Sequence, residues 1–122
     1  MTTADIVREI NGRDHSQAGQ GDVEQLTDFM ASRFPETVRL AAKFKMQLML
    51  RNMPPEDRAR CTDFLIEMLC SSTDTWQQRN IFEGLYGVHG TAIKGRLRQV
   101  VTNCQLDKLV RMRCLITLGV LN

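Results

Sequence analysis

Apolar residues recur every three or four positions along most of the chain, which is the period of an amphipathic α-helix. Prolines, glycines and short polar stretches such as SSTD at 71–74 interrupt this pattern and mark turns. Apolar runs such as RCLITLGVL could form strands by propensity alone, but their flanks continue the helical period. The pattern therefore predicts an all-α fold. The expected helices lie at about 3–10, 23–33, 35–52, 55–70, 75–88, 91–103 and 108–119.

The segment 11–22, NGRDHSQAGQGD, breaks the helical pattern near the N-terminus. It holds three glycines and a single apolar side chain, Ala18, so it has too little apolar surface to order itself. We therefore expect residues 1–21 to form a flexible arm with a short helix, and residues 22–122 to form a single helical domain. Of the six helical segments in this domain, five are expected to be main helices, arranged as antiparallel hairpins.

The segment 35–52 carries a wide apolar pattern and is expected to be a central helix. Its additional apolar residues widen the arc beyond one stripe, which is typical of a helix covered on two sides. The basic residues lie off the main stripe and are expected to face solvent. The stripe predicted to face the core consists of Leu40, Ala41, Phe44 and Leu48, and the basic residues off it are Arg39, Lys43 and Lys45.

Two segments of the C-terminal half superpose when Asp74 is placed over Asp107, an offset of 33 residues. Each segment then reads as a helix, a short turn with an acidic residue, a second helix and a glycine. Trp76 falls over Leu109 in this alignment. A period of this size with two helices per unit is typical of an α-solenoid.

The final unit has an acidic residue in its turn, followed by a Val-Arg pair, a small residue with a leucine, and a leucine with a glycine. These residues are Asp107, Val110-Arg111, Cys114-Leu115 and Leu118-Gly119. With this pattern the final unit resembles the HEAT and armadillo-like helical repeats. The preceding unit departs from it, because Gln77-Gln78 stands where a Val-Arg pair is expected. The resemblance covers about residues 55–122 and implies a stack of helical hairpins, with a compact helical bundle as the alternative.

The composition is that of an ordinary globular domain, with 43% hydrophobic and 25% charged residues. The sequence has no apolar run long enough to span a membrane and no secretory signal. None of the four cysteines lies in a C-x-x-C motif or near a histidine at metal-ligand spacing, so no metal site is expected. We interpret all four as reduced core thiols of a cytoplasmic or nuclear protein. They are Cys61, Cys70, Cys104 and Cys114.

Charge is distributed unevenly along the chain. Residues 1–74 hold nine Lys or Arg and twelve Asp or Glu, whereas residues 75–122 hold seven and two. A basic C-terminal part can bind nucleic-acid phosphates, so RNA is an alternative partner, although a solvated basic face is the favoured explanation of the pattern. The candidate nucleic-acid-binding residues are Lys94, Arg96, Arg98, Lys108, Arg111 and Arg113.

The sequence contains few candidate catalytic residues. The chain has two histidines, His15 and His89, and no sequence motif pairs either with a nucleophile. The glycine-rich YGVHGTAIKG at 86–95 does not fit a phosphate-binding loop, and no strand precedes it. We expect no enzyme activity, no catalytic residues, no cofactor and no small-molecule substrate.

The apolar C-terminal helix and a semi-exposed tryptophan indicate protein–protein interaction. An apolar face on a terminal helix needs cover, either from a partner or from a second copy of the chain. Aromatic and methionine side chains are common anchors in such interfaces. We therefore expect an adaptor or assembly module that binds a partner helix or itself, as a homo-oligomer. The candidate partner-binding residues are Trp76, Tyr86, Leu109, Met112 and Leu121.

Overall fold

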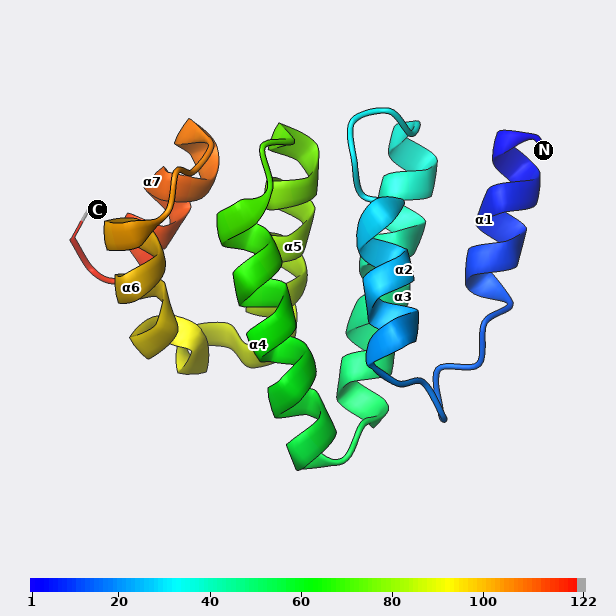
Figure 1. The fold of residues 1–122 in the computed structure, drawn as a ribbon, viewed down its shortest axis with the longest axis horizontal. Helices are drawn as coiled ribbons and strands as arrows, with labels where there is room; N and C mark the ends of the chain where they lie inside the picture. The colour runs from blue at the N-terminus through cyan, green and yellow to red at the C-terminus, as the bar shows by residue number, and fades with distance from the viewer. Residues whose placement is uncertain (121–122) are drawn as a thin grey trace.

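The computed structural model describes residues 1–120, and all regular structure among them is helical (Figure 1). The all-α prediction is thus confirmed. Six main helices, α2 to α7, form the body of the fold instead of the five predicted, and the short helix α1 precedes them. The elements are α1 Thr3–Asn11, α2 Gln20–Asp28, α3 Glu36–Asn52, α4 Pro55–Ser71, α5 Thr75–His89, the 3₁₀ helix η1 Gly90–Ile93, α6 Lys94–Asn103 and α7 Lys108–Thr117.

The helices lie in two layers (Figure 1). Helices α2, α4 and α6 form one layer, which we call the even layer, and α4 contacts both of its neighbours. Helices α1, α3, α5 and α7 form the odd layer, in which each helix packs on the next. The hairpins α2–α3, α4–α5 and α6–α7 connect the layers. Consecutive hairpins therefore stack side by side, and α3, α5 and α7 run in the same direction.

The chain reverses at caps that the sequence encodes locally. Asp74 and Asp107, which the sequence alignment superposes, are the N-cap residues of α5 and α7, and each carboxylate accepts backbone N–H groups of its own helix. Pro55 lies at the first turn of α4, where its missing N–H costs no hydrogen bond. Gly90 ends α5 with a φ of 56°, a conformation that favours glycine.

The hydrophobic core lies between the two layers and overturns the predicted orientation of α3. Phe44 and Leu48 are 55% and 40% exposed, whereas Lys43 and Lys45 are buried. Helix α3 is covered by α1, α2, α4 and α5, so its widest apolar arc, and not the predicted stripe, faces the core. The fully buried residues of that arc are Val38, Ala42, Met46, Met49 and Leu50.

The N-terminal helix α1 packs on α3 at one end of the odd layer. Ile10 is fully buried there. The ammonium group of Lys45 donates hydrogen bonds to the backbone oxygens of Asn11 and Arg13, at 2.9 and 3.0 Å. These contacts hold the segment that follows α1 against α3. The flexibility expected for residues 1–21 stays a prediction.

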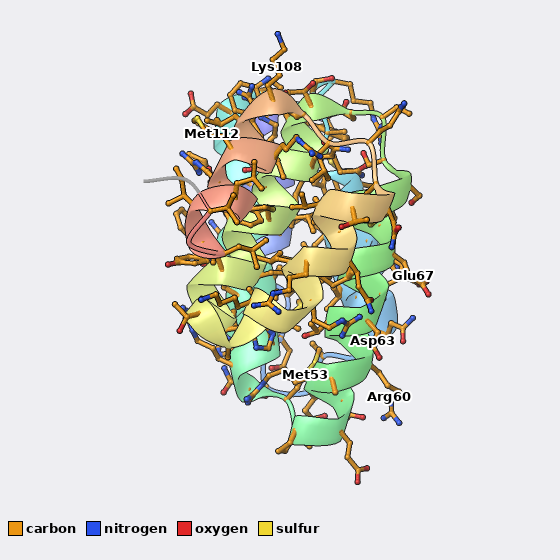
Figure 2. All side chains as sticks on the ribbon, turned by 90° about the vertical axis from the view of Figure 1, so that its left-hand side faces the viewer. Met53, Arg60, Asp63, Glu67, Lys108 and Met112 are labelled. Atoms are coloured by element: carbon orange, nitrogen blue, oxygen red, sulfur yellow. A yellow bond between two sulfur atoms is a disulfide. The ribbon has the colours of Figure 1, made fainter. Side chains whose placement is uncertain are left out.

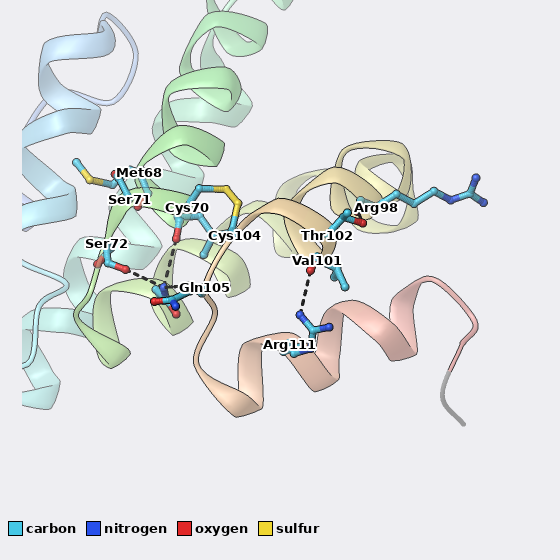
Figure 3. The surroundings of a disulfide bond; sticks show 12 residues. Met68, Cys70, Ser71, Ser72, Arg98, Val101, Thr102, Cys104, Gln105 and Arg111 are labelled. Atoms are coloured by element: carbon cyan, nitrogen blue, oxygen red, sulfur yellow. Dashed lines mark hydrogen bonds between the residues drawn. A yellow bond between two sulfur atoms is a disulfide. The ribbon is translucent and has the colours of Figure 1, made fainter.

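A disulfide bond joins Cys70, at the end of α4, to Cys104, directly after α6 (Figure 3). The prediction of reduced thiols is therefore wrong for these two residues. They lie 34 residues apart in sequence, and only the packing of α4 against α6 brings them together. Cys61 and Cys114 are buried free thiols, as predicted. The expectation of a cytoplasmic or nuclear protein relied on four reduced cysteines, and only Cys61 and Cys114 are free thiols.

Polar contacts also couple successive hairpins near the N-cap residues. The carboxylate of Asp74 accepts hydrogen bonds from the backbone N–H and the hydroxyl of Ser32, which lies before α3. The Gln78 side chain donates to the Gln105 carbonyl and accepts from the Asp107 N–H. Each hairpin is therefore tied to the previous one by side chains as well as by the core.

No helix among residues 1–120 combines the length and apolar character needed to cross a membrane.

Candidate partner-binding surface

The side of α3, α5 and α7 that points away from the even layer exposes large apolar side chains. The two on α3 are four residues apart, as are the two on α7, so each pair shares one side of its helix, and all six are between 40% and 55% exposed. Figure 2 shows one of them, Met112, on the side of the molecule opposite to Asp63 and Glu67 of α4. We call this surface the odd face. Its apolar residues are Phe44, Leu48, Trp76, Tyr86, Met112 and Ile116.

A mostly apolar pocket of about 340 Å³ lies between α5 and α7 on the odd face. The Phe82 and Tyr86 rings stack with their centroids 6.2 Å apart and form one wall. Ile116 and Arg113 of α7 line the pocket from the other side, with Thr117. The pocket is open to solvent between exposed apolar residues, so it can receive an apolar side chain from outside.

Glu83 connects three helices across the odd face. Its carboxylate accepts from Lys43 of α3 at 3.0 Å and from Arg113 of α7 at 2.6 Å. Partial burial acts to raise the pKa of Glu83, but the hydrogen bonds and charges of Lys43 and Arg113 outweigh it and leave the pKa below the ordinary value. Glu83 is therefore ionised at neutral pH and neutralised by its two partners.

Trp76 lies between two guanidinium groups. Arg39 of α3 stands 4.5 Å from the ring centroid and Arg79 of α5 stands 5.0 Å from it. The negative face of the aromatic ring attracts these guanidinium groups, and the contacts fix the orientation of the ring. The indole is still 41% exposed, so it remains available to a partner.

Charge separates between the two layers of helices. The odd layer, α1 with α3, α5 and α7, carries nine Lys or Arg and four Asp or Glu. The even layer, α2 with α4 and α6, carries five Lys or Arg and seven Asp or Glu. The odd layer is therefore basic. A comparison of residues 1–74 with residues 75–122 does not show this, because the basic helix α3 lies in the acidic N-terminal part of the chain.

The structure brings together three of the five residues predicted to bind a partner. Trp76, Tyr86 and Met112 are exposed on the odd face. Leu109 is only partly exposed at the start of α7, and Leu121 lies outside the described residues. The sequence pattern did not identify Phe44, Leu48 and Ile116 as surface residues. Phe44 and Leu48 belong to the stripe that was predicted to face the core. The width of the apolar arc in 35–52 was the signal that not all of its apolar residues could be buried.

The six basic residues proposed to bind nucleic acid are all exposed but point to different neighbours. Arg96 forms an ion pair with Asp63 of α4 at 2.6 Å. Arg113 pairs with Glu83 on the odd face, and Arg111 donates to the Val101 carbonyl at 2.9 Å (Figure 3). Each of these three guanidinium groups thus makes one contact within the protein and keeps further N–H donors. The remaining members of the set are Lys94, Arg98 and Lys108.

His89, the histidine considered for a Cys–His pair, contacts a threonine instead. Its Nε2 lies 2.9 Å from Oγ1 of Thr62. Burial lowers the pKa of His89, and the charge of Arg58 lowers it further, so the ring is neutral at pH 7. This hydrogen bond joins the end of α5 to α4 and has the character of a structural contact.

Comparison of the chain with protein-family models, with curated proteins and with solved structures gives no match.

Proposed function

We propose that the protein is a non-catalytic interaction module that holds a helical segment of a partner protein on its odd face. The observation that carries this proposal is the apolar pocket between α5 and α7, surrounded by exposed apolar side chains. Isolated apolar side chains on a surface need no explanation, but a contiguous patch around a pocket is typical of an interaction site. A helix that offers an apolar stripe fits such a groove.

The stacked hairpins support the same proposal. Helices α3, α5 and α7 lie side by side in one layer (Figure 1), so their exposed apolar residues lie on neighbouring helices. Repeated helical hairpins generate extended binding surfaces of this kind. The equivalent N-cap positions of Asp74 and Asp107 also favour the HEAT-like interpretation of the hairpins over a compact bundle.

A partner protein is favoured over a second copy of the chain at this surface. Two odd faces placed against each other would bring the basic helices α3, α5 and α7 of both copies together. Like charges at an interface oppose association. Self-association through the odd face would therefore need screening of these charges, whereas a partner with acidic residues would not.

The test is a selection from a displayed library of amphipathic helical peptides on the purified protein. Enriched peptides are then titrated against wild type, Ile116→Glu and Ala59→Glu. Both substitutions add one negative charge at an exposed position, but only Ile116 lines the pocket, while Ala59 lies on α4 of the even layer. We expect Ile116→Glu to weaken binding at least about tenfold, since an apolar contact becomes a charge that must lose water, and Ala59→Glu to leave it unchanged.

Two results would contradict the proposal. The first is a selection that enriches no helix, and the second is a set of peptides whose binding Ile116→Glu leaves intact. Light scattering over a range of protein concentrations belongs to the same experiment. If the protein forms a dimer and Ile116→Glu dissociates it, the occupant of the odd face is a second copy of the chain and not a partner protein.

The alternative is RNA binding through α6 and α7, which carry six basic residues and no acidic ones. It is tested by fluorescence anisotropy with an RNA duplex at about 0.05 and 0.2 M salt. Binding that weakens steeply with salt and is lost in the variant Lys94→Glu with Arg98→Glu would favour this alternative. No binding at the lower salt concentration would exclude it.

A further inference from the structure

We infer that the segment held on the odd face is an amphipathic helix whose polar flanks are acidic. This inference rests on the proposed function and adds the chemistry of the partner. It is carried by the cations that stand between the apolar residues of the odd face, and by the bonds that those cations already make within the protein.

Arg39 and Arg51 mark the two ends of the odd face on α3. Arg39 stacks on Trp76 and donates to the Phe34 carbonyl. Arg51 donates to the Gly87 carbonyl of α5 at 3.0 Å, beside the pocket that Gly87 lines. Within residues 1–120 neither guanidinium forms an ion pair with a carboxylate. Each guanidinium has five N–H donors, so both keep donors for a carboxylate from outside.

Arg113 places a third cation at the pocket itself. Its Nη1 donates to Glu83 at 2.6 Å, and its side chain is 44% exposed. The guanidinium is a fork of donors, and one bond to Glu83 does not occupy it. A partner helix that inserts an apolar side chain between Tyr86 and Ile116 can therefore offer a carboxylate, one turn away, to Arg113.

The acidic side chains of the protein do not compensate this surface. Helices α3, α5 and α7 contain two acidic residues, Glu36 and Glu83. Glu83 is neutralised by Lys43 and Arg113, and the N-cap residue Asp107 pairs with Arg79, so neither Glu83 nor Asp107 compensates Arg39 or Arg51. A neutral helix could thus fill the apolar pocket but would lack charge complementarity with the surrounding cations. A basic helix would be repelled by them. An acidic helix satisfies both features of the surface.

The experiment uses a helix library in which every flanking position is drawn equally from Glu, Gln and Lys around a varied apolar stripe. We expect the enriched sequences to be rich in Glu at the flanks. The best binder is then made in three versions, with its flanking residues all Glu, all Gln or all Lys. The Gln version should bind about tenfold more weakly than the Glu version, and the Glu version should weaken as salt is raised from about 0.05 to 0.5 M.

A pair of double variants with equal charge change locates the effect. Arg39→Glu with Arg51→Glu should reverse the preference from Glu to Lys flanks. Arg60→Glu with Arg98→Glu, on α4 and α6, should keep it, because both side chains are exposed and both helices belong to the even layer. Circular dichroism and thermal melting show whether each variant is folded before it is compared.

The outcomes separate this inference from the proposed function. Enriched helices with neutral or basic flanks that still lose binding to Ile116→Glu would overturn the acidic partner and keep the interaction module. The acidic partner is also overturned if both double variants behave alike. A selection that enriches nothing contradicts the interaction module itself, and the inference falls with it.

Discussion

Arg79 and Asp107 join two consecutive hairpins through a single carboxylate. Nε of Arg79 on α5 lies 2.9 Å from Oδ2 of Asp107, and the same oxygen accepts the backbone N–H of Leu109 at 3.1 Å, at the start of α7. The hydrogen bond from Arg79 is the main cause that lowers the pKa of Asp107. The residue that begins α7 is therefore also the one that fixes α7 to α5.

Replacing Asp107 by Ala should destabilise the fold by about 1–2 kcal/mol, the usual cost of a lost N-cap. Because the same carboxylate holds Arg79, the loss from Asp107→Ala and Arg79→Ala together should be smaller than the sum of the two single losses. Urea unfolding of the four proteins of this double-mutant cycle measures the coupling. Additive losses would show that Asp107 acts as a cap alone.

Acid should weaken the contact that joins α3, α5 and α7. The pKa of Glu83 in the folded protein lies below the ordinary glutamate value of 4.5, so its contribution to stability is present above about pH 4.5 and disappears as the pH falls through the folded-state pKa. Glu83→Gln should therefore be less stable than wild type at pH 7, and the difference should shrink towards pH 3. Unfolding curves across this range test it, with Glu67→Gln on the even layer as the matched control. A gap between wild type and Glu83→Gln that stays constant with pH would refute the assignment.

Reduction should destabilise the protein without changing its fold class. The Cys70–Cys104 bond closes a sequence separation of 34 residues, for which chain-entropy arguments give about 3–4 kcal/mol. Thermal melting with and without a dithiol reductant measures the effect. The variant Cys70→Ser with Cys104→Ser should match the reduced wild type and should not respond to the reductant. Identical melting of wild type in both conditions would mean that the bond does not form in solution.

Lys45→Met should loosen the N-terminal segment. The ammonium group of Lys45 is buried and donates to the carbonyls of Asn11 and Arg13, so its loss leaves both without these donors and should cost about 2 kcal/mol. Hydrogen exchange of the α1 amides should become faster, while α5 should be little affected. Arg8→Met, at an exposed site of α1, is the control. Unprotected α1 amides in the wild type would instead support the flexible arm that the sequence predicts.

The local signals in the sequence were sufficient for most of the helices, but the helix expected at 23–33 spans Gln20–Asp28. The 3.6-residue period, the turn at 71–74 and the two aspartates located α4 to α7 closely, because each signal acts within a few residues of its own position. The start of α2 was less well placed. It begins at Gln20, where Asp22 accepts the Gly19 N–H, so the glycine-rich composition of 11–22 concealed a helix start.

The same signals did not determine which side of a helix faces the core. In α3 the period is compatible with several orientations, since apolar residues occur almost all the way round. The packing of α1, α2, α4 and α5 decided it, exposing Phe44 and Leu48 and burying Lys43 and Lys45. Burial of these lysines is possible because each ammonium group reaches oxygen acceptors on another element.

By itself, the sequence determined an all-helical chain, its turns and the repeated aspartate that begins α5 and α7, because capping and amphipathic periodicity are local properties. Only the tertiary structure decided the pairing of Cys70 with Cys104, the Lys43–Glu83–Arg113 contact and the pocket between α5 and α7. These features join residues that are about 30 to 40 positions apart in sequence. No local pattern specifies such a distance, and the stacking of one hairpin on the next does.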